Sequence, residues 1–213
     1  MLKKVALFSG LPPEEIESFE RLSVKKSYKK HTIVIDKGDE TSSLFVILSG
    51  SIKVFLADED GKEIVLSHME PGDYFGELAL IGETQRSASV MTLEDSKFLI
   101  ISKSALKTCL SKNPNMAFNI INGLINRINY LTQKVSDLGL RDVYGRVISL
   151  LQQRATAEGG AWTTCKMTQQ DIANEVGSSR EMVSRIFKDL KTGGYIAVEG
   201  GRITVMKKLP PKW

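Results

Sequence analysis

The sequence predicts an α+β fold in which an antiparallel β-barrel or sandwich precedes one long helix and a small helical domain. Three observations indicate this order. Short β-type runs separated by turn signals occupy residues 29–102. Apolar residues then recur at helical spacing after Asn113-Pro114, and two short helices joined by a glycine-containing turn follow near residues 168–192. A length of 213 residues is enough for one large or two small domains.

The composition is that of an ordinary globular protein. Hydrophobic residues make up 42% of the chain and charged residues 25%, which excludes collagen-like, disordered and purely coiled-coil classes. No apolar stretch approaches the roughly 18 residues that span a membrane, and the apolar core at the N-terminus is too short for a signal peptide. We therefore expect a cytoplasmic protein.

The two cysteines, Cys109 and Cys165, lie far apart in the chain and form no CxxC motif. The sequence therefore supports no disulfide framework, structural zinc site or iron–sulfur cluster. We expect both cysteines to be small buried residues.

Positive charge is concentrated near the C-terminus. The whole chain has 29 Lys and Arg against 25 Asp and Glu, a net charge of +4. Residues 141–213 contain 12 of the basic and 7 of the acidic residues, which leaves 17 and 18 in the first 140 residues. The positive excess thus lies in the last third of the chain, as expected for a segment that binds a polyanion.

Six β-type runs lie in the first half of the chain. Turn signals separate them at Gly38-Asp39, Ser49-Gly50, Asp60-Gly61, Gly72-Asp73 and Gly82. Many short strands at this spacing predict an antiparallel barrel or sandwich. The runs are HTIVID, SLFVIL, SIKVFLA, EIVLSHM, SASVMT and KFLIIS.

A single long helix is predicted after Asn113-Pro114. Its apolar residues have heptad spacing, and a second row runs beside the first. The stripe is too wide for one partner, so one edge can pack on the β domain and the other on the same helix of a second copy, in a parallel dimer. Burial inside a monomer is the alternative. The first row is Ile121, Leu124, Ile128, Leu131, Val135 and Leu138, and the second is Phe118, Ile121, Ile125, Ile128, Thr132 and Val135.

A helical pattern and a loop, ATAEGGAWTT, then lead into a compact unit. Thr168 and Asp171 have the spacing of a capping box that opens one helix, and Gly177 ends it. Residues 178–181 form a second box before a second helix, so the pair predicts a helix-turn-helix. A hairpin turning at Gly200-Gly201 would be the wing of a winged helix. The buried face of the second helix is expected to consist of Met182, Val183, Ile186, Phe187 and Leu190.

The segment PGDYFGELALIGETQRSASV contains the residues of a phosphate cradle. Gly72 and Gly76 permit sharp turns, and backbone N–H groups exposed after such a turn can hold a phosphate. Arg86 can pair with its charge, and Ser87 can donate a further hydrogen bond. Glu77 would repel a phosphate, so it must face a hydrogen-bond donor such as a ribose hydroxyl. The combination predicts a phosphorylated sugar as the ligand.

The second helix of the helix-turn-helix carries charged residues at its N-terminal end. Arg180 and Arg185 can each bind guanine O6 and N7 in the major groove, and Glu181 can accept from cytosine N4. Each good pair contributes roughly 1–3 kcal/mol to base discrimination. Ser184 and Lys188 project from the same side, so the pattern predicts a base-reading helix.

Both groups of residues resemble a known family. FGELAL…RSA is similar to the phosphate-binding cassette of cyclic-nucleotide-binding domains, in the shorter form seen in regulatory subunits of cyclic-AMP-dependent protein kinase. SSREMVSRIFKDL after TQQDIANEVG resembles the DNA-reading element of bacterial cyclic-AMP receptor proteins, and the likeness continues back through NPN…QKVSDLGLRDVYGRV. Over nearly its whole length the chain resembles the cyclic-AMP receptor protein and fumarate–nitrate regulator superfamily, above all the receptor-protein branch.

The resemblance implies a homodimeric transcription regulator without enzymatic activity. It implies a double-stranded β-helix (β-roll or jelly-roll) with short flanking helices over residues 1–112, a dimerisation helix over 113–139 and a winged helix-turn-helix over 140–213. Cyclic AMP would be the allosteric effector, and the operator would be a near-palindrome of TGTGA-like half-sites about one turn apart. By the same analogy the loop Ala155–Trp162 would contact RNA polymerase. The hinge between long helix and DNA-binding domain is expected at Asp142 and Val143.

The resemblance also implies two sets of site residues. The nucleotide-binding set is Gly76, Glu77, Leu78, Ala79, Arg86, Ser87, Arg127, Leu131, Thr132, Val54 and Leu66. The DNA-binding set is Thr168, Gln169, Gln170, Ser179, Arg180, Glu181, Ser184, Arg185 and Lys188.

One position departs from the family. Two adjacent hydroxyl residues on the family's long helix reach the adenine, and the alignment of QKVSDL places Leu131 and Thr132 there. A lost hydrogen bond to a base edge relaxes base selection. Cyclic GMP, cyclic di-GMP and ligand-independent DNA binding therefore stay open beside cyclic AMP. Arg127, one turn back, matches a position near the phosphate and can pair with Glu77 or with the ligand.

Other functions explain less of the chain. A cupin-type metalloenzyme needs several histidines and a carboxylate around one metal, and His31 and His68 are the only histidines. His68 could in principle ligate haem, but a single histidine in an alternating strand is more often structural. A nucleotide-dependent regulatory subunit would leave the helix-turn-helix unexplained. We expect no metal, haem or iron–sulfur cluster.

Overall fold

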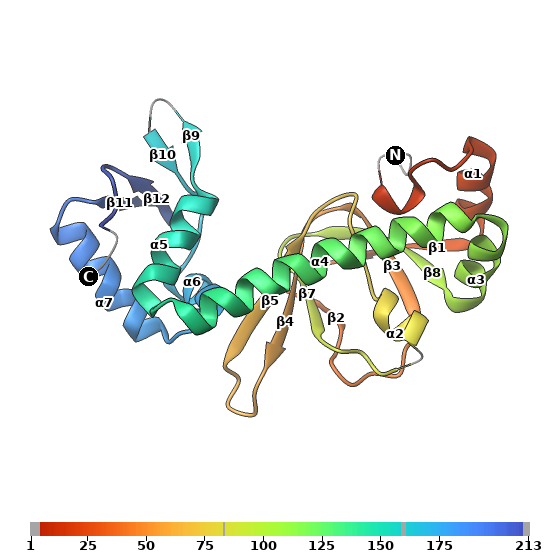
Figure 1. The fold of residues 1–213 in the computed structure, drawn as a ribbon, viewed down its shortest axis with the longest axis horizontal. Coiled ribbons are helices and arrows are strands. Elements are labelled where there is room, and N and C mark those ends of the chain that lie inside the picture. Colours follow the sequence, from red (N-terminus) through yellow and green to blue (C-terminus); the bar gives the residue numbers. More distant parts are fainter. Residues whose placement is uncertain (1–4, 83, 159–160, 211–213) are drawn as a thin grey trace. The chain divides into compact units, whose positions relative to one another are not determined.

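The computed structural model describes residues 5–82, 84–158 and 161–210, and the chain divides into two compact units. The first unit consists of Met1–Leu56 and Val65–Tyr130, and the second of Ala57–Ile64 and Leu131–Trp213. Helices and strands occur in both units, which confirms the α+β class (Figure 1). Within the described part of the chain, none of the helices has both the length and the apolar character needed to cross a membrane.

The first unit is built on two four-stranded sheets. Neighbouring strands of one sheet follow the order β1 (Ser23–Tyr28), β8 (Ser96–Ser102), β3 (Ser43–Ser49) and β6 (Tyr74–Phe75). The other sheet has the order β2 (Ile33–Ile35), β7 (Ser89–Thr92), β4 (Ile52–Ala57) and β5 (Glu63–Met69). Antiparallel pairing joins β8 to both β1 and β3, and β3 to β6. In the other sheet it joins β7 to both β2 and β4. Residues of both sheets share one apolar cluster, in which the rings of Phe45 and Phe75 stack with centroids 4.9 Å apart.

All six predicted β-type runs form strands, namely β2, β3, β4, β5, β7 and β8. Two strands of the first unit were not predicted. β1 is an edge strand whose four central residues are exposed, so it has no apolar alternation that would reveal it. β6 has only two residues, and it forms because Phe45 and Val46 of β3 pair with it.

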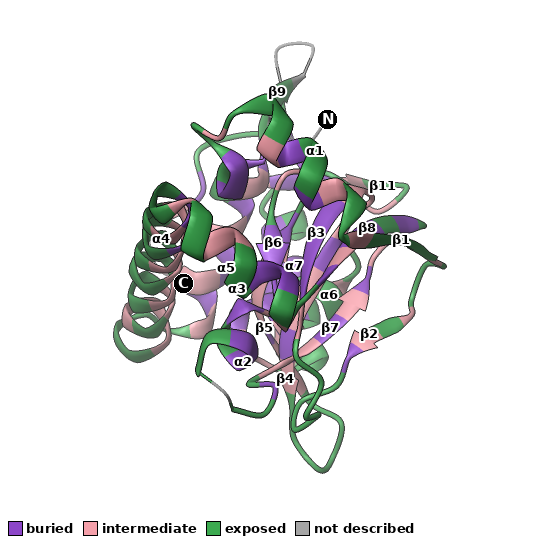
Figure 2. Cartoon of the chain, turned by 90° about the vertical axis from the view of Figure 1, so that its right-hand side faces the viewer, coloured by how far each residue is buried: buried purple, intermediate pink, exposed green. Residues whose placement is uncertain are grey.

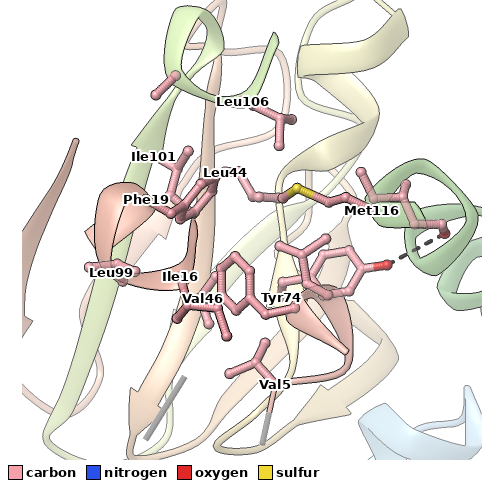
Figure 3. Packing of buried hydrophobic residues seen from close by; sticks show 14 of the residues in the cluster. Val5, Ile16, Phe19, Leu44, Val46, Tyr74, Leu99, Ile101, Leu106 and Met116 are labelled. Atoms are coloured by element: carbon pink, nitrogen blue, oxygen red, sulfur yellow. Dashed lines mark hydrogen bonds between the residues drawn. The ribbon is translucent and has the colours of Figure 1, made fainter. Parts of the chain in front are cut away.

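Short helices flank the sheets of the first unit. They are the 3-10 helix Ala6–Phe8, α1 (Pro13–Arg21), α2 (Glu77–Gly82) and α3 (Lys103–Lys112). α1 contributes Phe19 and α3 contributes Leu106 to a core that also contains Leu44 and Met116 (Figure 3). Cys109 of α3 is half-buried against this core.

The long helix α4 extends over Pro114–Leu140. Met116 and Ile120 are buried in the core of the first unit, and Leu124, Leu131 and Leu138 are half-buried. The second predicted apolar row remains largely exposed, so exposed and partly buried segments alternate along α4 (Figure 2). Its exposed apolar residues are Phe118, Ile121, Ile125, Ile128 and Val135.

The second unit contains three further helices and a third sheet. α5 (Val143–Arg154), α6 (Gln169–Val176) and α7 (Arg180–Thr192) pack around a common apolar core. The sheet has the order β11 (Ile196–Glu199), β12 (Arg202–Val205), β10 (Ala161–Thr163) and β9 (Thr156–Glu158). The hairpin of β11 and β12 turns at Gly200 and Gly201, whose φ angles are 56° and 84°, as predicted for the wing.

Two expectations for the segment between α5 and α6 are wrong. Thr156–Glu158 and Ala161–Thr163 are not loop residues, because they form β9 and β10 of an antiparallel hairpin, and Trp162 of β10 pairs with Val205 of β12. Pairing with β12 overrides the loop signal of the small residues around 159–160, which themselves lie outside the described residues. Cys165 is exposed rather than buried, because it lies in the surface segment that connects β10 to α6.

Candidate functional site

The first candidate site lies where β6 ends and α2 begins. Gly76 joins them with a φ of 88°, a left-handed conformation that favours glycine. A Cβ at this position would lie 2.7 Å from both Arg86 Nη1 and the Ser43 carbonyl oxygen, so a side chain would also collide. The turn places the side chain of Glu77 in the interior, where it is fully buried.

The Glu77 carboxylate is paired with Arg127 of α4. Arg127 donates from Nη1 to Glu77 Oε1 at 2.6 Å. From Nη2 it donates to the Tyr74 carbonyl oxygen at 3.3 Å and contacts Met69 Sδ at 3.8 Å. This is one of the two pairings expected for Arg127, and it connects the long helix directly to the turn at Gly76.

The second oxygen of Glu77, Oε2, is buried, and no group in the described part of the chain donates a hydrogen bond to it. A buried acceptor without a donor costs on the order of 1–3 kcal/mol. The first oxygen is already held by a charged donor. Oε2 is therefore suited to accept a hydrogen bond from a hydroxyl group of a ligand.

Arg86 lies beside the same turn and is only 4% exposed. Its guanidinium donates to the carbonyl oxygens of Gly76 at 2.8 Å and Ser43 at 2.9 Å, and to Thr41 Oγ1 at 3.3 Å. Burial lowers the pKa of Arg86, and the charges of nearby carboxylates oppose this shift. Arginine nevertheless keeps its charge at neutral pH. The site therefore combines a buried cation with an acceptor that lacks a donor, which suits a ligand with a phosphate and a hydroxyl.

The other implied nucleotide-binding residues are distributed over several elements. In α2, Ala79 is buried and Leu78 is exposed, while Ser87 follows Arg86 on the surface. Val54 of β4 and Leu66 of β5 are half-buried on neighbouring strands. Two further residues of the set belong to the second unit, the half-buried Leu131 and the exposed Thr132.

Sequence reasoning missed four residues that contact the charged groups of the site. Ser43 and Tyr74 do so through carbonyl oxygens, which every residue type provides, so their identity leaves no signal. Thr41 and Met69 lie far from Arg86 and Arg127 in the sequence, so only the fold brings them together.

The second candidate site is the surface of α7. The Ser179 hydroxyl accepts a hydrogen bond from the backbone N–H three residues on, at 3.2 Å, and so caps the helix. The box predicted for residues 178–181 is therefore wrong by one position, because Glu181 is the second residue of the helix rather than the third. Hydrogen bonds from its own backbone N–H and from Ser179 lower the pKa of the Glu181 carboxyl. The capping box of Thr168 and Asp171 on α6 is confirmed.

The residues of α7 divide into a buried and an exposed face. Four of the five predicted core residues are buried and Met182 is half-buried. On α6, Gln170 is exposed and donates to Asn174 Oδ1 at 2.8 Å, and Gln169 is half-buried. Every residue of the implied DNA-binding set that lies on α7 is exposed, namely Arg180, Glu181, Ser184, Arg185 and Lys188.

A buried carboxylate connects the helices of the second unit. Glu175 of α6 is 8% exposed. Its Oε1 lies 3.1 Å from Arg154 Nη2 of α5, and its Oε2 lies 3.6 Å from Lys134 Nζ of α4. Burial lowers the pKa of Lys134, and the Glu175 charge opposes that shift. One ion pair therefore joins the end of the long helix to α6, the first helix of the helix-turn-helix, and the other joins α5 to α6.

Two family models match the chain. The cyclic nucleotide-binding domain matches residues 25–113, and the Crp-like helix-turn-helix domain matches residues 145–209. The turn at Gly76 with Glu77 and Arg86 lies in the first match, and α7 lies in the second.

Named relatives share both parts. The cAMP-activated global transcriptional regulator CRP of Salmonella typhimurium is 32% identical over 84% of this chain and 87% of its own length. The regulator Vfr of Pseudomonas aeruginosa is 31% identical over 85% and 88%. The structure of the c-di-GMP responsive global regulator CLP of Xanthomonas campestris is 26% identical, with a TM-score of 0.84 over 92% of this chain and 100% of that one. This chain therefore belongs to the cyclic-AMP receptor protein and fumarate–nitrate regulator superfamily and is a CRP-like, cyclic-nucleotide-responsive transcription regulator.

Proposed function

We propose that cyclic AMP is the allosteric effector and that it binds around Glu77, Arg86 and Arg127. The observation that carries this proposal is the buried Glu77 Oε2, to which no described residue donates. A ribose hydroxyl would donate to this oxygen, and Arg86 would hold the phosphate together with Ser87 and the first backbone N–H groups of α2. The relatives named as cAMP-activated support the choice of nucleotide.

The base of the nucleotide would be held by the remaining residues of the implied set. These are Val54, Leu66, Leu78, Ala79, Leu131 and Thr132. One observation favours cyclic di-GMP as a second candidate effector, since Leu131 stands where the family has a hydroxyl group. The Xanthomonas campestris relative, which is described as c-di-GMP responsive, supports testing this nucleotide.

Binding of the effector would reach the DNA-binding helices through α4. Arg127 connects α4 to the site, and Lys134, seven residues or about two turns further along α4, pairs with Glu175 of α6. An effector that binds the DNA-competent arrangement more tightly than the other shifts the population toward it. We place the hinge at Asp142 and Val143, where Asp142 Oδ1 accepts from Gly145 N at 2.7 Å and caps α5.

The protein would act as a homodimer on DNA. The exposed apolar row of α4 supports pairing with the same helix of a second copy. Arg180 and Arg185 would bind guanines and Glu181 a cytosine in TGTGA-like half-sites, one half-site for each protomer. Residues 155–162, now seen to contain the strands of a hairpin, are proposed to contact RNA polymerase.

Fluorescence anisotropy of a labelled duplex tests the proposal. The duplex carries TGTGA and TCACA about six base pairs apart, and a duplex with both half-sites scrambled is the control. The protein is titrated at fixed salt, alone and with cyclic AMP, cyclic GMP or cyclic di-GMP. Tight binding to the first duplex that requires cyclic AMP is expected. Binding that needs no nucleotide, or that one nucleotide abolishes, would contradict activation by cyclic AMP, and equal affinity for both duplexes would contradict the half-site.

A further inference from the structure

The Tyr74 side chain joins β6 to α4 at a second point, apart from the Glu77–Arg127 pair. Tyr74 is 7% exposed, and its hydroxyl donates to the Ile120 carbonyl oxygen of α4 at 3.4 Å. Figure 3 shows the ring directed from the core of the first unit toward the helix, with the hydroxyl at its end. The hydroxyl therefore meets the backbone of α4 rather than solvent.

This approach is open only because residue 123 is a glycine. A Cβ at Gly123 would overlap Tyr74 Oη and would lie 3.1 Å from Tyr74 Cζ. A second glycine of α4, Gly139, has nothing within 4 Å of the position that a Cβ would take. Glycine is unfavourable inside a helix, so a glycine that leaves space for a buried hydroxyl indicates a packing role at that position.

We call the space that Gly123 leaves for the Tyr74 hydroxyl the notch at Gly123. The contact in the notch and the ion pair of Arg127 connect the same two segments. Gly123 and Arg127 are four residues apart on one face of α4, and Tyr74 and Glu77 are three residues apart around the Gly76 turn. Arg127 Nη2 also donates to the carbonyl oxygen of Tyr74 itself. A displacement of α4 at the notch must therefore move Arg127 relative to Glu77.

We propose that Tyr74 is a positioning residue, whose hydroxyl in the notch at Gly123 fixes α4 where Arg127 reaches Glu77 and thereby sets the affinity for the effector. This inference rests on the proposed function, because it takes Glu77 as the carboxylate that binds the nucleotide. The role of Tyr74 is steric and acts through the helix. Gly123→Ala alone should therefore lower the affinity for the effector, and Tyr74→Phe in addition should restore it.

Four variants of the full chain test this inference: Gly123→Ala, Tyr74→Phe, the double variant and the control Gly139→Ala. Isothermal titration calorimetry measures binding of cyclic AMP, cyclic GMP and cyclic di-GMP, and thermal unfolding is followed in parallel. Gly139→Ala should bind like the unaltered protein. Gly123→Ala should bind about tenfold more weakly, within the range of coupling between contacting residues. The double variant should recover to within about threefold, because removal of the hydroxyl leaves a contact that a small shift can accommodate.

The rescue separates positioning from stability alone. If Gly123→Ala binds as tightly as Gly139→Ala, or if the double variant binds no better than Gly123→Ala, the inference is overturned. If Gly123→Ala does not fold, folding and tight binding by the double variant would support the notch, and failure of the double variant to fold would overturn it. An unaltered protein that binds none of the three nucleotides would overturn the proposed function and this inference together. If the unaltered protein binds a nucleotide and all four variants bind it with the same affinity, the inference alone is overturned.

Discussion

Arg127 Nη1 lies 2.6 Å from Glu77 Oε1, and this ion pair joins the long helix α4 to the turn that opens α2. The Glu77 side chain is fully buried, whereas 27% of the Arg127 side chain is exposed. Removing one partner of a buried pair leaves the other charge unpaired and typically costs about 3–5 kcal/mol. Replacing both partners by uncharged groups costs less, so the contribution of the pair can be separated from that of its members.

Arg127→Met is expected to lower the free energy of unfolding by about 3 kcal/mol, because the Glu77 carboxylate stays buried and loses its charged donor. In Glu77→Gln/Arg127→Met neither member of the pair remains as an unpaired buried charge, so this double variant should be more stable than Arg127→Met. Urea unfolding of the ligand-free proteins, followed by circular dichroism, measures both. If the loss of unfolding free energy in the double variant equals the sum of the losses in the two single variants, the two side chains are not coupled.

Arg86→Ala is expected to weaken binding of cyclic AMP by roughly 10- to 100-fold, the loss of a hydrogen bond to a charged group. Arg86 also holds the carbonyl groups of Gly76 and Ser43, so thermal unfolding must be measured beside the calorimetric affinity. Arg86→Lys keeps the charge and should bind more tightly than Arg86→Ala. The exposed Arg21 of α1 provides the control Arg21→Ala. A folded Arg86→Ala protein with unchanged affinity would remove Arg86 from the site.

Much of the fold follows from local patterns in the sequence. The six predicted strands are short apolar or alternating runs between turn residues, and α4 and α7 have clear helical spacing. What the patterns could not show depends on partners that are distant in the chain. β1 is polar because it lies at a sheet edge, and β10 is a strand because β12 pairs with it.

The candidate site was predictable in part for the same reason. The short motif from Gly76 to Ser87 reveals Glu77 and Arg86, but only the family resemblance pointed to Arg127, which is 50 residues from Glu77. Glu175 was missed because the spacing of a short polar helix does not distinguish a buried acid from an exposed one. The notch at Gly123 was missed because nothing near it in the sequence indicates that a tyrosine 49 residues earlier packs there.

The phenol of Tyr74 should titrate at unusually high pH. Burial raises the pKa of Tyr74 from 10.0 to about 12, the Glu77 charge adds to the shift and Arg127 opposes it. Since the folded protein keeps a proton that the unfolded chain releases, this stabilising contribution is complete below pH 10 and is lost as the pH rises toward 12. Ultraviolet titration of phenolate in the unaltered protein and in Tyr74→Phe isolates the difference. A difference curve centred near pH 10 would contradict the burial of the hydroxyl.

Arg180→Ala should reduce the preference for a TGTGA duplex over a scrambled one by about 1–3 kcal/mol, because a base contact contributes to specificity. Affinity for the scrambled duplex should change little. Lys191→Ala is the matched control, since Lys191 is an exposed cation in the last turn of α7 and does not belong to the proposed DNA-binding set. Anisotropy at one salt concentration compares the three proteins on both duplexes. An equal loss on both duplexes would make Arg180 a phosphate contact.

Ile128→Glu should convert the protein to a monomer. Ile128 is 62% exposed in the single chain and lies in the apolar row of α4, so a charge there costs the fold little but would be buried in a paired helix. Asn126→Glu lies two residues away, which is about 200° around the helix. It introduces the same charge on exposed helix surface outside the row and should leave the dimer intact. Light scattering gives the mass of each protein, and anisotropy shows whether the monomer loses affinity for the two-half-site duplex. A dimeric Ile128→Glu protein would place the contact between protomers away from this row.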